Sequence, residues 1–317
     1  WKKKIDKAYR FREQLFGDFS YTNAFRLVFA EGDSIPGLII DVYDDIAVFQ
    51  CHSAGIYQIK NMLVELLQEI MEGKLAAVYD KSSDTIQRIK NQTSENGFLM
   101  GEKSKTTILE NNLKFYVDVE KGQKTGFFLD QRENRKLLRE YSDGLKVLNL
   151  YAYTGGFSVY ALDGNAGYVE SVDSSAKAMD LTDENITLNN LDPKKHKSIT
   201  TDALEYLKEM ENNTFDIIVL DPPAFAKSRS SRHNAVQGYK RINALALDKI
   251  KPGGLLFTFS CSMVIDRNLF FNTVTAAAIQ SGRAVSILHS LSQPADHPSS
   301  IFHPEGNYLK GLVLKIE

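Results

Sequence analysis

The sequence predicts an α/β protein with a Rossmann-like, doubly wound and mostly parallel seven-stranded sheet, preceded by a small α+β domain. Short apolar strands alternate with amphipathic helices after Lys121, and this order is typical of a parallel sheet with helices on both faces. Two strands near the C-terminus follow one another without a helix, which indicates an antiparallel closing strand. We expect a basic linker segment at 1–20, the α+β domain at 21–120 and the Rossmann-like domain at 121–317.

The small domain begins as a strand meander. Strand-like runs separated by Gly, Asp and Pro turns lie at 25–29, 38–42, 46–49, 76–79 and 115–119. A helix is predicted at 56–71, because apolar residues such as Ile59, Leu63 and Ile70 recur at helical spacing.

The larger domain alternates strands with helices. Its buried strands are predicted at 147–151, 168–172, 217–220 and 255–259, with a weaker one at 197–201. Helices are predicted at 157–162, 175–189, 203–210, 234–250 and 269–280. The antiparallel pair lies at 285–289 and 309–316. Because ligands bind beyond the carboxyl ends of strands in such sheets, we expect the functional residues directly after the strands.

Composition excludes several classes of protein. The chain has 317 residues, 43% of them hydrophobic and 25% charged, and no apolar run approaches the roughly 20 residues that cross a bilayer. Its net charge of -2 gives no overall attraction for nucleic acid, although basic residues cluster at 2–12 and 227–241. Cys51 and Cys261 are the only cysteines, which suits a reducing, cytoplasmic location. We expect Cys51 to serve packing.

A glycine-rich turn and two acids predict a nucleotide site. Gly155 and Gly156 follow the first strand of the larger domain, where glycine permits a tight turn at a helix N-terminus. Asp173 ends the next strand, where a carboxylate accepts hydrogen bonds from ribose hydroxyls, and Asp202 is placed to meet an adenine amino group. The third glycine of the G-x-G-x-x-G dinucleotide fingerprint is absent, which favours S-adenosylmethionine over a nicotinamide cofactor. Glycines that serve only the turn are the alternative.

Two further strands end in residues suited to chemistry on a heterocycle. Asp221-Pro222-Pro223 fixes a carboxylate after one strand, and Cys261 follows the next. Attack of a thiolate on carbon 6 of cytosine lets carbon 5 accept a methyl group, while a protonated Asp221 donates to ring nitrogen 3. The Asp-Pro-Pro turn also fits methylation of an exocyclic amine, a route that needs no thiol. A packed cysteine and a capping carboxylate are the purely structural interpretations.

Four segments carry a resemblance to a known family. They are GQKTGFFLDQR at 122–132, NLYAYTGGF at 149–157, DPPAF at 221–225 and TFSCS at 258–262. Together they resemble the bacterial large-subunit ribosomal RNA cytosine-5 methyltransferase family, in the branch that carries an N-terminal PUA domain. The resemblance covers 121–317 closely, including ADHP at 295–298 and PEGNYLKG at 304–311, and is looser over 20–118. Met263 stands where many relatives have a small glycine.

The resemblance implies an S-adenosylmethionine-dependent methyltransferase that forms 5-methylcytosine in RNA with Cys261 as nucleophile. In that family an RNA-binding PUA domain precedes the small domain, and we expect this chain to be a fragment that starts just after it. We expect ribosomal RNA as partner and no membrane association, and the chain could form a homodimer. No metal is expected, because His297 and His303 have no Cys or acid at recognisable ligand spacing.

The expected site residues fall into three groups. Catalysis is assigned to Cys261 and Asp221. The cofactor group comprises Phe128, Asp130, Gln131, Asn149, Tyr151, Tyr153, Thr154, Gly155, Gly156, Phe157, Asp173, Ser174, Asp202, Ala203 and Asp221. The substrate group comprises Pro222, Pro223, Phe225, Lys227, Arg229, Lys124 and Arg132. The alternatives are a guanine or exocyclic-amine RNA methyltransferase, an RNA-binding factor without catalysis and, more remotely, a nicotinamide oxidoreductase.

Overall fold

The computed structural model describes residues 1–86, 95–226 and 228–317. The chain divides into two compact units. The first comprises 1–132 and 294–307, and the second comprises 133–293 and 308–317. The first unit therefore extends to Arg132 instead of ending near residue 120, and it includes a segment that sequence analysis placed in the larger domain.

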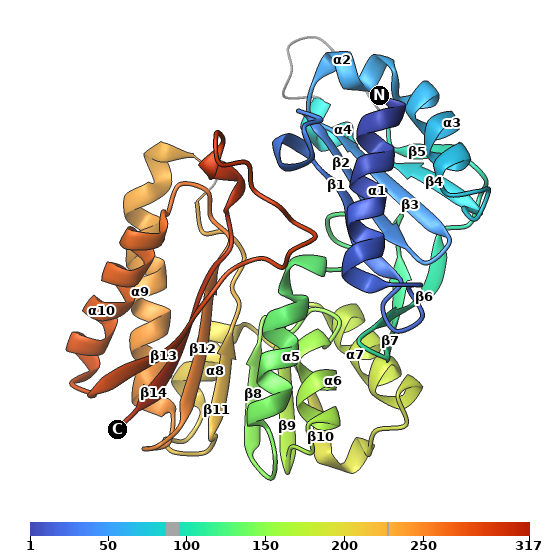
Figure 1. Cartoon of the computed structure of the whole chain (residues 1–317). Coiled ribbons are helices and arrows are strands. Elements are labelled where there is room, and N and C mark those ends of the chain that lie inside the picture. Colours follow the sequence, from blue (N-terminus) through green and yellow to red (C-terminus); the bar gives the residue numbers. More distant parts are fainter. Residues whose placement is uncertain (87–94, 227) are drawn as a thin grey trace. The chain divides into compact units, whose positions relative to one another are not determined.

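The first unit is built on a five-stranded sheet of order β1-β2-β3-β4-β5 (Figure 1). Its strands are β1 Ala24–Phe29, β2 Leu38–Tyr43, β3 Ile46–Cys51, β4 Ala77–Asp80 and β5 Gly97–Met100. The first three form the predicted antiparallel meander, and β4 runs parallel to β3. A separate antiparallel ribbon pairs β6 Lys105–Glu110 with β7 Leu113–Asp118.

Helix α1 occupies the place of the expected linker. It spans Lys2–Phe16, and its apolar residues, among them Ile5 and Tyr9, join the core formed by the strands of the first unit. The predicted helix at 56–71 is divided near Ile59 into two helices. The other helical segments of this unit are α2 Ala54–Gln58, α3 Lys60–Ile70, α4 Ser83–Ile86, η1 Ala30–Asp33, η2 Leu129–Gln131 and η5 Pro304–Gly306.

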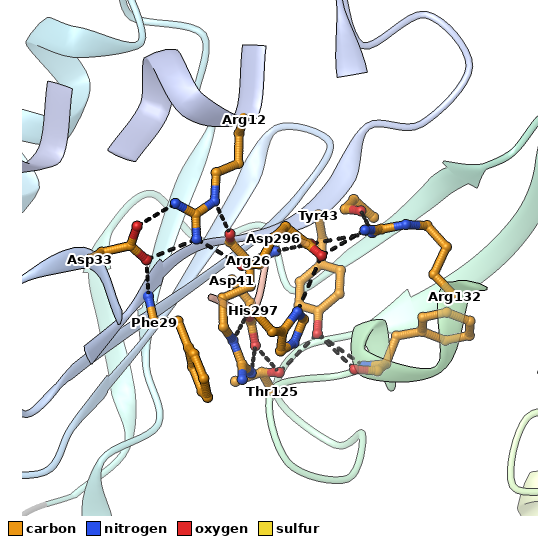
Figure 2. Close-up of polar contacts among 12 residues, drawn as sticks. Arg12, Arg26, Phe29, Asp33, Asp41, Tyr43, Thr125, Arg132, Asp296 and His297 are labelled. Carbon is orange, nitrogen blue, oxygen red and sulfur yellow. Dashed lines mark hydrogen bonds and ion pairs between the residues drawn. The ribbon is translucent and has the colours of Figure 1, made fainter. Parts of the chain in front are cut away.

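Figure 2 shows a buried polar network that holds the two chain segments of the first unit together. Arg12 of α1 donates to both carboxylate oxygens of Asp33, at 2.5 and 2.8 Å, and to the backbone carbonyl of Asp296 at 2.7 Å. The carboxylate of Asp296 accepts hydrogen bonds from Arg132 Nη2 at 2.6 Å and from the backbone N–H of Arg26 at 3.0 Å. Asp296 thereby connects α1 and β1 with Arg132.

The same network overturns one expectation and sharpens another. Arg132 was expected at RNA phosphate, but it is buried, with its guanidinium 4.6 Å from the centre of the Phe16 ring and paired with Asp296. A phosphate cannot reach a side chain so enclosed, so this prediction is wrong. His297 was expected in a plain loop, and it is buried with Nδ1 3.2 Å from Asp296 Oδ1. Burial is the main cause of its lowered pKa.

The second unit has the predicted Rossmann-like sheet. Its order is β10-β9-β8-β11-β12-β14-β13. The strands are β8 Lys146–Leu150, β9 Tyr168–Asp173, β10 His196–Thr200, β11 Ile217–Leu220, β12 Leu255–Ser260, β13 Val285–Leu291 and β14 Lys310–Ile316. The five strands from β8 to β12 run parallel, and β14 is antiparallel to both of its neighbours. The strand order reverses beside β8, where ligands of open α/β sheets bind.

Helices cover both faces of this sheet. They are α5 Arg132–Tyr141, α6 Gly156–Asp163, α7 Ala176–Leu188, α8 Ala203–Glu209, α9 Arg232–Lys249 and α10 Arg267–Ser281, with η3 Pro193–Lys195 and η4 Arg229–Ser231. Helices α8, α9 and α10 share one apolar core with Leu148, Leu256 and Leu314 of the strands. On the other face, Tyr141 of α5 packs on Phe257 and Phe157 of α6 packs on Phe259. Within the part of the chain that the structure describes, every helix is too short or too polar to cross a membrane.

Candidate active site

The turn between β8 and α6 adopts a left-handed conformation that contacts with α7 hold in place. Tyr153 and Gly155 have φ angles of 49° and 74°. A Cβ atom on Gly155 would lie 2.4 Å from Thr182 Cγ2, so both the backbone angle and the close approach require glycine. Thr182 Oγ1 donates to the Tyr153 carbonyl at 3.1 Å, and Asn185 Nδ2 donates to the Thr154 carbonyl at 2.9 Å.

Asp173, at the end of β9, braces the same turn. Its carboxylate accepts hydrogen bonds from the backbone N–H groups of Tyr153 and Ser175, each at 2.9 Å. A carboxylate offers about four acceptor positions, so the bonds to the turn leave capacity for ribose hydroxyls. The structure thus brings Asp173 and the glycine-rich turn together. Ser174 is exposed beside them, and Ser175 caps α7.

Asp202 follows β10 and begins α8. Its Oδ1 accepts hydrogen bonds from the N–H groups of Leu204 and Glu205 at 2.9 and 3.1 Å, which is helix capping. Its Oδ2 forms no hydrogen bond with any residue that the structure describes. Burial raises the pKa of Tyr151 to about 12, and the Asp202 carboxylate adds to that shift. Asp202 is therefore close to the turn after β8, while Ala203 is buried in α8.

Asn149 was expected in the cofactor group, and the structure places its side chain in a hydrogen bond with α6. Strand residues alternate between the two faces of a sheet, and Asn149 lies on the face that α6 covers. Its Nδ2 donates to Ser158 Oγ at 2.8 Å, and Ser158 shares a hydrogen bond of 2.6 Å with Ser171. Ser171 in turn bonds His196 Nε2 at 2.7 Å. The residue belongs to a buried polar chain that joins α6 to β8, β9 and β10.

The loops after β11 and β12 carry the two expected catalytic residues. These strands are parallel neighbours, so Asp221 and Cys261 lie at the same edge of the sheet, and both are partly exposed. Ser262 Oγ donates to the carbonyl of Ala226 at 2.9 Å and ties one loop to the other. Two partly exposed groups, an acid and a thiol, therefore lie in loops that a hydrogen bond joins.

The residues beside Asp221 differ in exposure. Pro222 is buried and Pro223 is exposed. The half-buried ring of Phe225 packs on Tyr239 of α9, with ring centroids 4.7 Å apart. Lys227 lies outside the described residues, and Arg229 begins η4.

Two buried side chains next to Cys261 were not expected. Burial raises the pKa of Tyr239, and Cys261 and Asp221 contribute to that shift. Lys310 of β14 donates from Nζ to the carbonyls of Ser262 and Tyr308, both at 2.7 Å. The one sequence signal for Lys310 was a lysine at the start of a mostly apolar strand. Tyr239 was hidden in the apolar pattern of α9.

Four further expected residues, Lys124, Phe128, Asp130 and Gln131, belong to the first unit. Lys124 is exposed, with Nζ 5.6 Å from the centre of the Phe128 ring. Asp130 and Gln131 lie in η2 and are buried.

Comparison with known proteins identifies the family. A family model for S-adenosylmethionine-dependent methyltransferases matches residues 62–306. Ribosomal RNA large subunit methyltransferase I from Alteromonas mediterranea is 38% identical over 317 residues, which cover 99% of this chain and 79% of the relative. The protein of the same name from Aeromonas hydrophila is 40% identical over 296 residues, covering 92% and 74%. The chain belongs to the S-adenosylmethionine-dependent methyltransferase family.

Solved structures agree with this family. A Streptococcus mutans protein assigned as a SAM-dependent methyltransferase matches this methyltransferase with a TM-score of 0.86 and 26% identity, covering 99% of this chain and 80% of that one. A second protein assigned as a methyltransferase, in complex with SAH, matches with a TM-score of 0.85 and 26% identity, covering 99% and 81%. The predicted fold and the predicted cofactor are therefore confirmed.

The turn after β8 fits S-adenosylmethionine. Gly155 caps α6 without a side chain, so the first N–H groups of the methyltransferase's α6 have no capping side chain. Unsatisfied N–H groups at a helix N-terminus favour an anionic group such as the carboxylate of an amino acid.

Proposed function

We propose that this methyltransferase forms 5-methylcytosine in large-subunit ribosomal RNA. The names of the relatives at 38% and 40% identity support ribosomal RNA as the substrate. One observation carries the cytosine assignment: Cys261 and Asp221 follow neighbouring parallel strands, in loops joined by the hydrogen bond from Ser262 to Ala226. A nucleophile and a proton donor at one edge of a sheet are what attack on a pyrimidine ring requires.

Cys261 begins the reaction as a thiolate. Its sulfur forms a bond to carbon 6 of cytosine, and the electrons of the carbon 5–carbon 6 double bond move into the ring as Asp221 gives a proton to nitrogen 3. When bound, S-adenosylmethionine supplies the methyl group that carbon 5 takes up. A base then removes the carbon-5 proton, the sulfur–carbon bond breaks, and the thiolate leaves with its electron pair while the proton on nitrogen 3 returns to Asp221.

The cofactor is assigned to the turn after β8 and its neighbours. Asp173 would accept hydrogen bonds from ribose hydroxyls, and Asp202 would accept one from the adenine amino group through Oδ2. The N–H groups at the start of α6 would bind the carboxylate of the methionine moiety. On the substrate side, Pro223 and Phe225 flank Asp221 and would contact a base that has been turned out of its stack.

The decisive test is the identity of the methylated nucleoside. Ribosomal RNA treated with the protein and S-adenosylmethionine should contain new 5-methylcytosine by nucleoside mass spectrometry. Cys261→Ala should lose at least about a thousandfold of this activity, the scale expected when a nucleophile is removed. Cys51→Ala, at the other cysteine, should retain activity, because Cys51 is buried in the core of the first unit.

Two results would contradict the proposal. A methyl mark on guanine or adenine excludes the cytosine assignment. Full activity of Cys261→Ala excludes the covalent route and favours methylation of an exocyclic amine beside the Asp-Pro-Pro turn.

A further inference from the structure

Lys310 is a buried lysine placed directly against the loop of Cys261. It pairs with Ser260 across the antiparallel strands β12 and β14, and its residue exposure is 3%. Its Nζ donates to the carbonyl of Ser262 and to that of Tyr308, both at 2.7 Å. Because Ser260 and Ser262 flank Cys261, the ammonium group reaches past the backbone of Cys261.

The Lys310 ammonium has no carboxylate partner within 4.0 Å among the described residues. Its two hydrogen bonds go to backbone carbonyls, whereas an ammonium has three N–H donors. Taking a charged amine out of water is costly unless an opposite charge compensates it. Lys315, further along the same strand, shows the usual arrangement, since it is exposed. The burial of Lys310 therefore calls for an anion nearby.

Three ionisable groups act on Lys310. Burial is the largest influence and lowers its pKa to about 8, while Cys261 has the opposite effect. Arg267 adds to the lowering, and Asp266 raises the pKa. The carboxylate of Asp266 already caps α10, because it accepts a hydrogen bond from the Leu269 N–H at 2.8 Å. The partly exposed Cys261 is the group whose ionisation would place a new negative charge beside Lys310.

Two other groups near Cys261 carry no positive charge. Tyr239 of α9 is buried, and Asp221 lies in the neighbouring loop. Cys261 and Asp221 both add to the raised pKa of Tyr239, after the larger effect of burial. Neither a tyrosine nor a carboxyl group supplies a positive charge to a thiolate, whereas Lys310 of β14 does.

We propose that the Lys310 ammonium is the counter-ion of a Cys261 thiolate and holds its loop for attack. This inference rests on the proposed role of Cys261 as nucleophile. In the ion pair, the thiol has released its proton to solvent, and Lys310 keeps all of its own. Lys310 forms no bond to substrate, so it is a positioning residue. The thiolate fraction at neutral pH, and with it the rate of attack, depends on this charge.

Alkylation of Cys261 by iodoacetamide, followed against pH by peptide mass spectrometry, measures the ionisation of this thiol directly. In the wild-type protein its midpoint should lie at least about one unit below the ordinary value of about 8.5. Lys310→Met keeps a long unbranched side chain without the charge. It should raise the midpoint and slow alkylation at neutral pH at least about tenfold, with the limiting rate at high pH unchanged.

The same chain supplies two controls. Lys315→Met removes a lysine from the exposed part of β14 and should leave the midpoint unchanged. Cys51 should react slowly in every variant, because burial raises its pKa to about 11. A purely structural role of Lys310 would change the melting temperature or the limiting rate and leave the midpoint in place. Lys310→Gln serves as a second uncharged variant if Lys310→Met does not fold.

A wild-type midpoint at or above about 8.5, or an unchanged midpoint in Lys310→Met, overturns the proposal. If neither variant folds, the wild-type midpoint is the test, and a value at or above about 8.5 overturns the proposal. Alkylation needs neither cofactor nor RNA, so the two proposals fail separately. A mark other than 5-methylcytosine, found together with a lowered midpoint, contradicts the proposed function. An ordinary midpoint, found together with 5-methylcytosine, contradicts only the role of Lys310.

Discussion

Gly155 is the residue that most constrains the turn after β8, where we propose that the cofactor binds. Gly155→Ala would place a methyl group 2.4 Å from Thr182 Cγ2 on a backbone with φ of 74°. We expect the turn to shift and the affinity for S-adenosylmethionine to fall at least about tenfold, equivalent to about 1.4 kcal/mol. Isothermal titration calorimetry measures this directly.

Gly144 offers a matched control for that substitution. It lies in the same unit with φ of 71°, but nothing occupies the space around a Cβ atom there. Gly144→Ala therefore carries the backbone strain without the clash and should keep the affinity for the cofactor. Equal affinities for Gly155→Ala and the wild type would show that the turn does not shape the cofactor site.

Single residues could be predicted where their role follows from a position at a strand end. The positions of Gly155, Asp173 and Cys261 at the carboxyl ends of strands were predicted in this way, because parallel strands place these ends at one edge; their roles stay predictions. Arg132 and Lys310 could not be placed correctly, since their partners Asp296 and Ser262 lie 164 and 48 positions away. Residue type alone does not say whether a cation meets solvent or a buried carboxylate.

At the scale of elements, α1 shows how a charged segment can be part of a core. Arg12 has an exposure of 0% and pairs with Asp33. Arg12→Met should lower the free energy of unfolding by about 3–5 kcal/mol, because it leaves the carboxylate of Asp33 buried without its partner. Urea denaturation followed by circular dichroism checks this value.

Arg10 provides the comparison within the same helix. It is exposed, and its contacts with Asp6 and Glu13 are surface ion pairs, so Arg10→Met should leave the midpoint of unfolding nearly unchanged. Similar effects of the two substitutions would mean that the buried pair does not stabilise the first unit.

Most elements of the second unit were predictable because their apolar runs and helical spacing are strong and regular, whereas α5 was not among the predicted helices. The elements of the first unit were less predictable from the sequence. The basic residues of α1 conceal a narrow apolar stripe that includes Ile5, Tyr9 and Phe16. Strand β5 is short and half-buried, and β6 carries polar residues at its start, so neither has the alternation that identifies a strand.

At the scale of the whole molecule, Asp296 links stability to pH. Burial opposes its charge, yet Arg132 and His297 outweigh burial and hold its pKa well below the ordinary value. A carboxyl group with a lowered pKa in the folded state stabilises the protein above its unfolded pKa of about 3.9, and this stability is lost as the pH falls further. Asp296→Asn should lower the free energy of unfolding by about 3–5 kcal/mol at neutral pH.

The difference in the free energy of unfolding between the wild type and Asp296→Asn should therefore become smaller as the pH falls below about 4. Urea unfolding at a series of pH values measures it. Asp180→Asn, at an exposed position of α7, should show no such dependence. A difference that stays constant down to acidic pH would mean that the charge of Asp296 does not contribute to stability.

The Rossmann-like fold was predictable because strand-helix alternation leaves few possible topologies. The division of the chain into two units was not predictable from the sequence. The segment 294–307 follows β13 in sequence, and only the buried contacts of Asp296 and His297 show that it folds with residues 1–132. Such long-range contacts leave no periodic pattern in the sequence.

The split of the first unit also bears on how such proteins can be recombined. The chain passes from one unit to the other after Arg132, after Gln293 and after Asn307. A single genetic crossover at Arg132 would give a hybrid whose Arg12 and Arg132 face an Asp296 segment from a different parent. Exchange of the first unit between homologues therefore requires that both of its segments come from the same parent. The fourteen residues 294–307 must then be inherited together with the helix α1, which is remote in sequence.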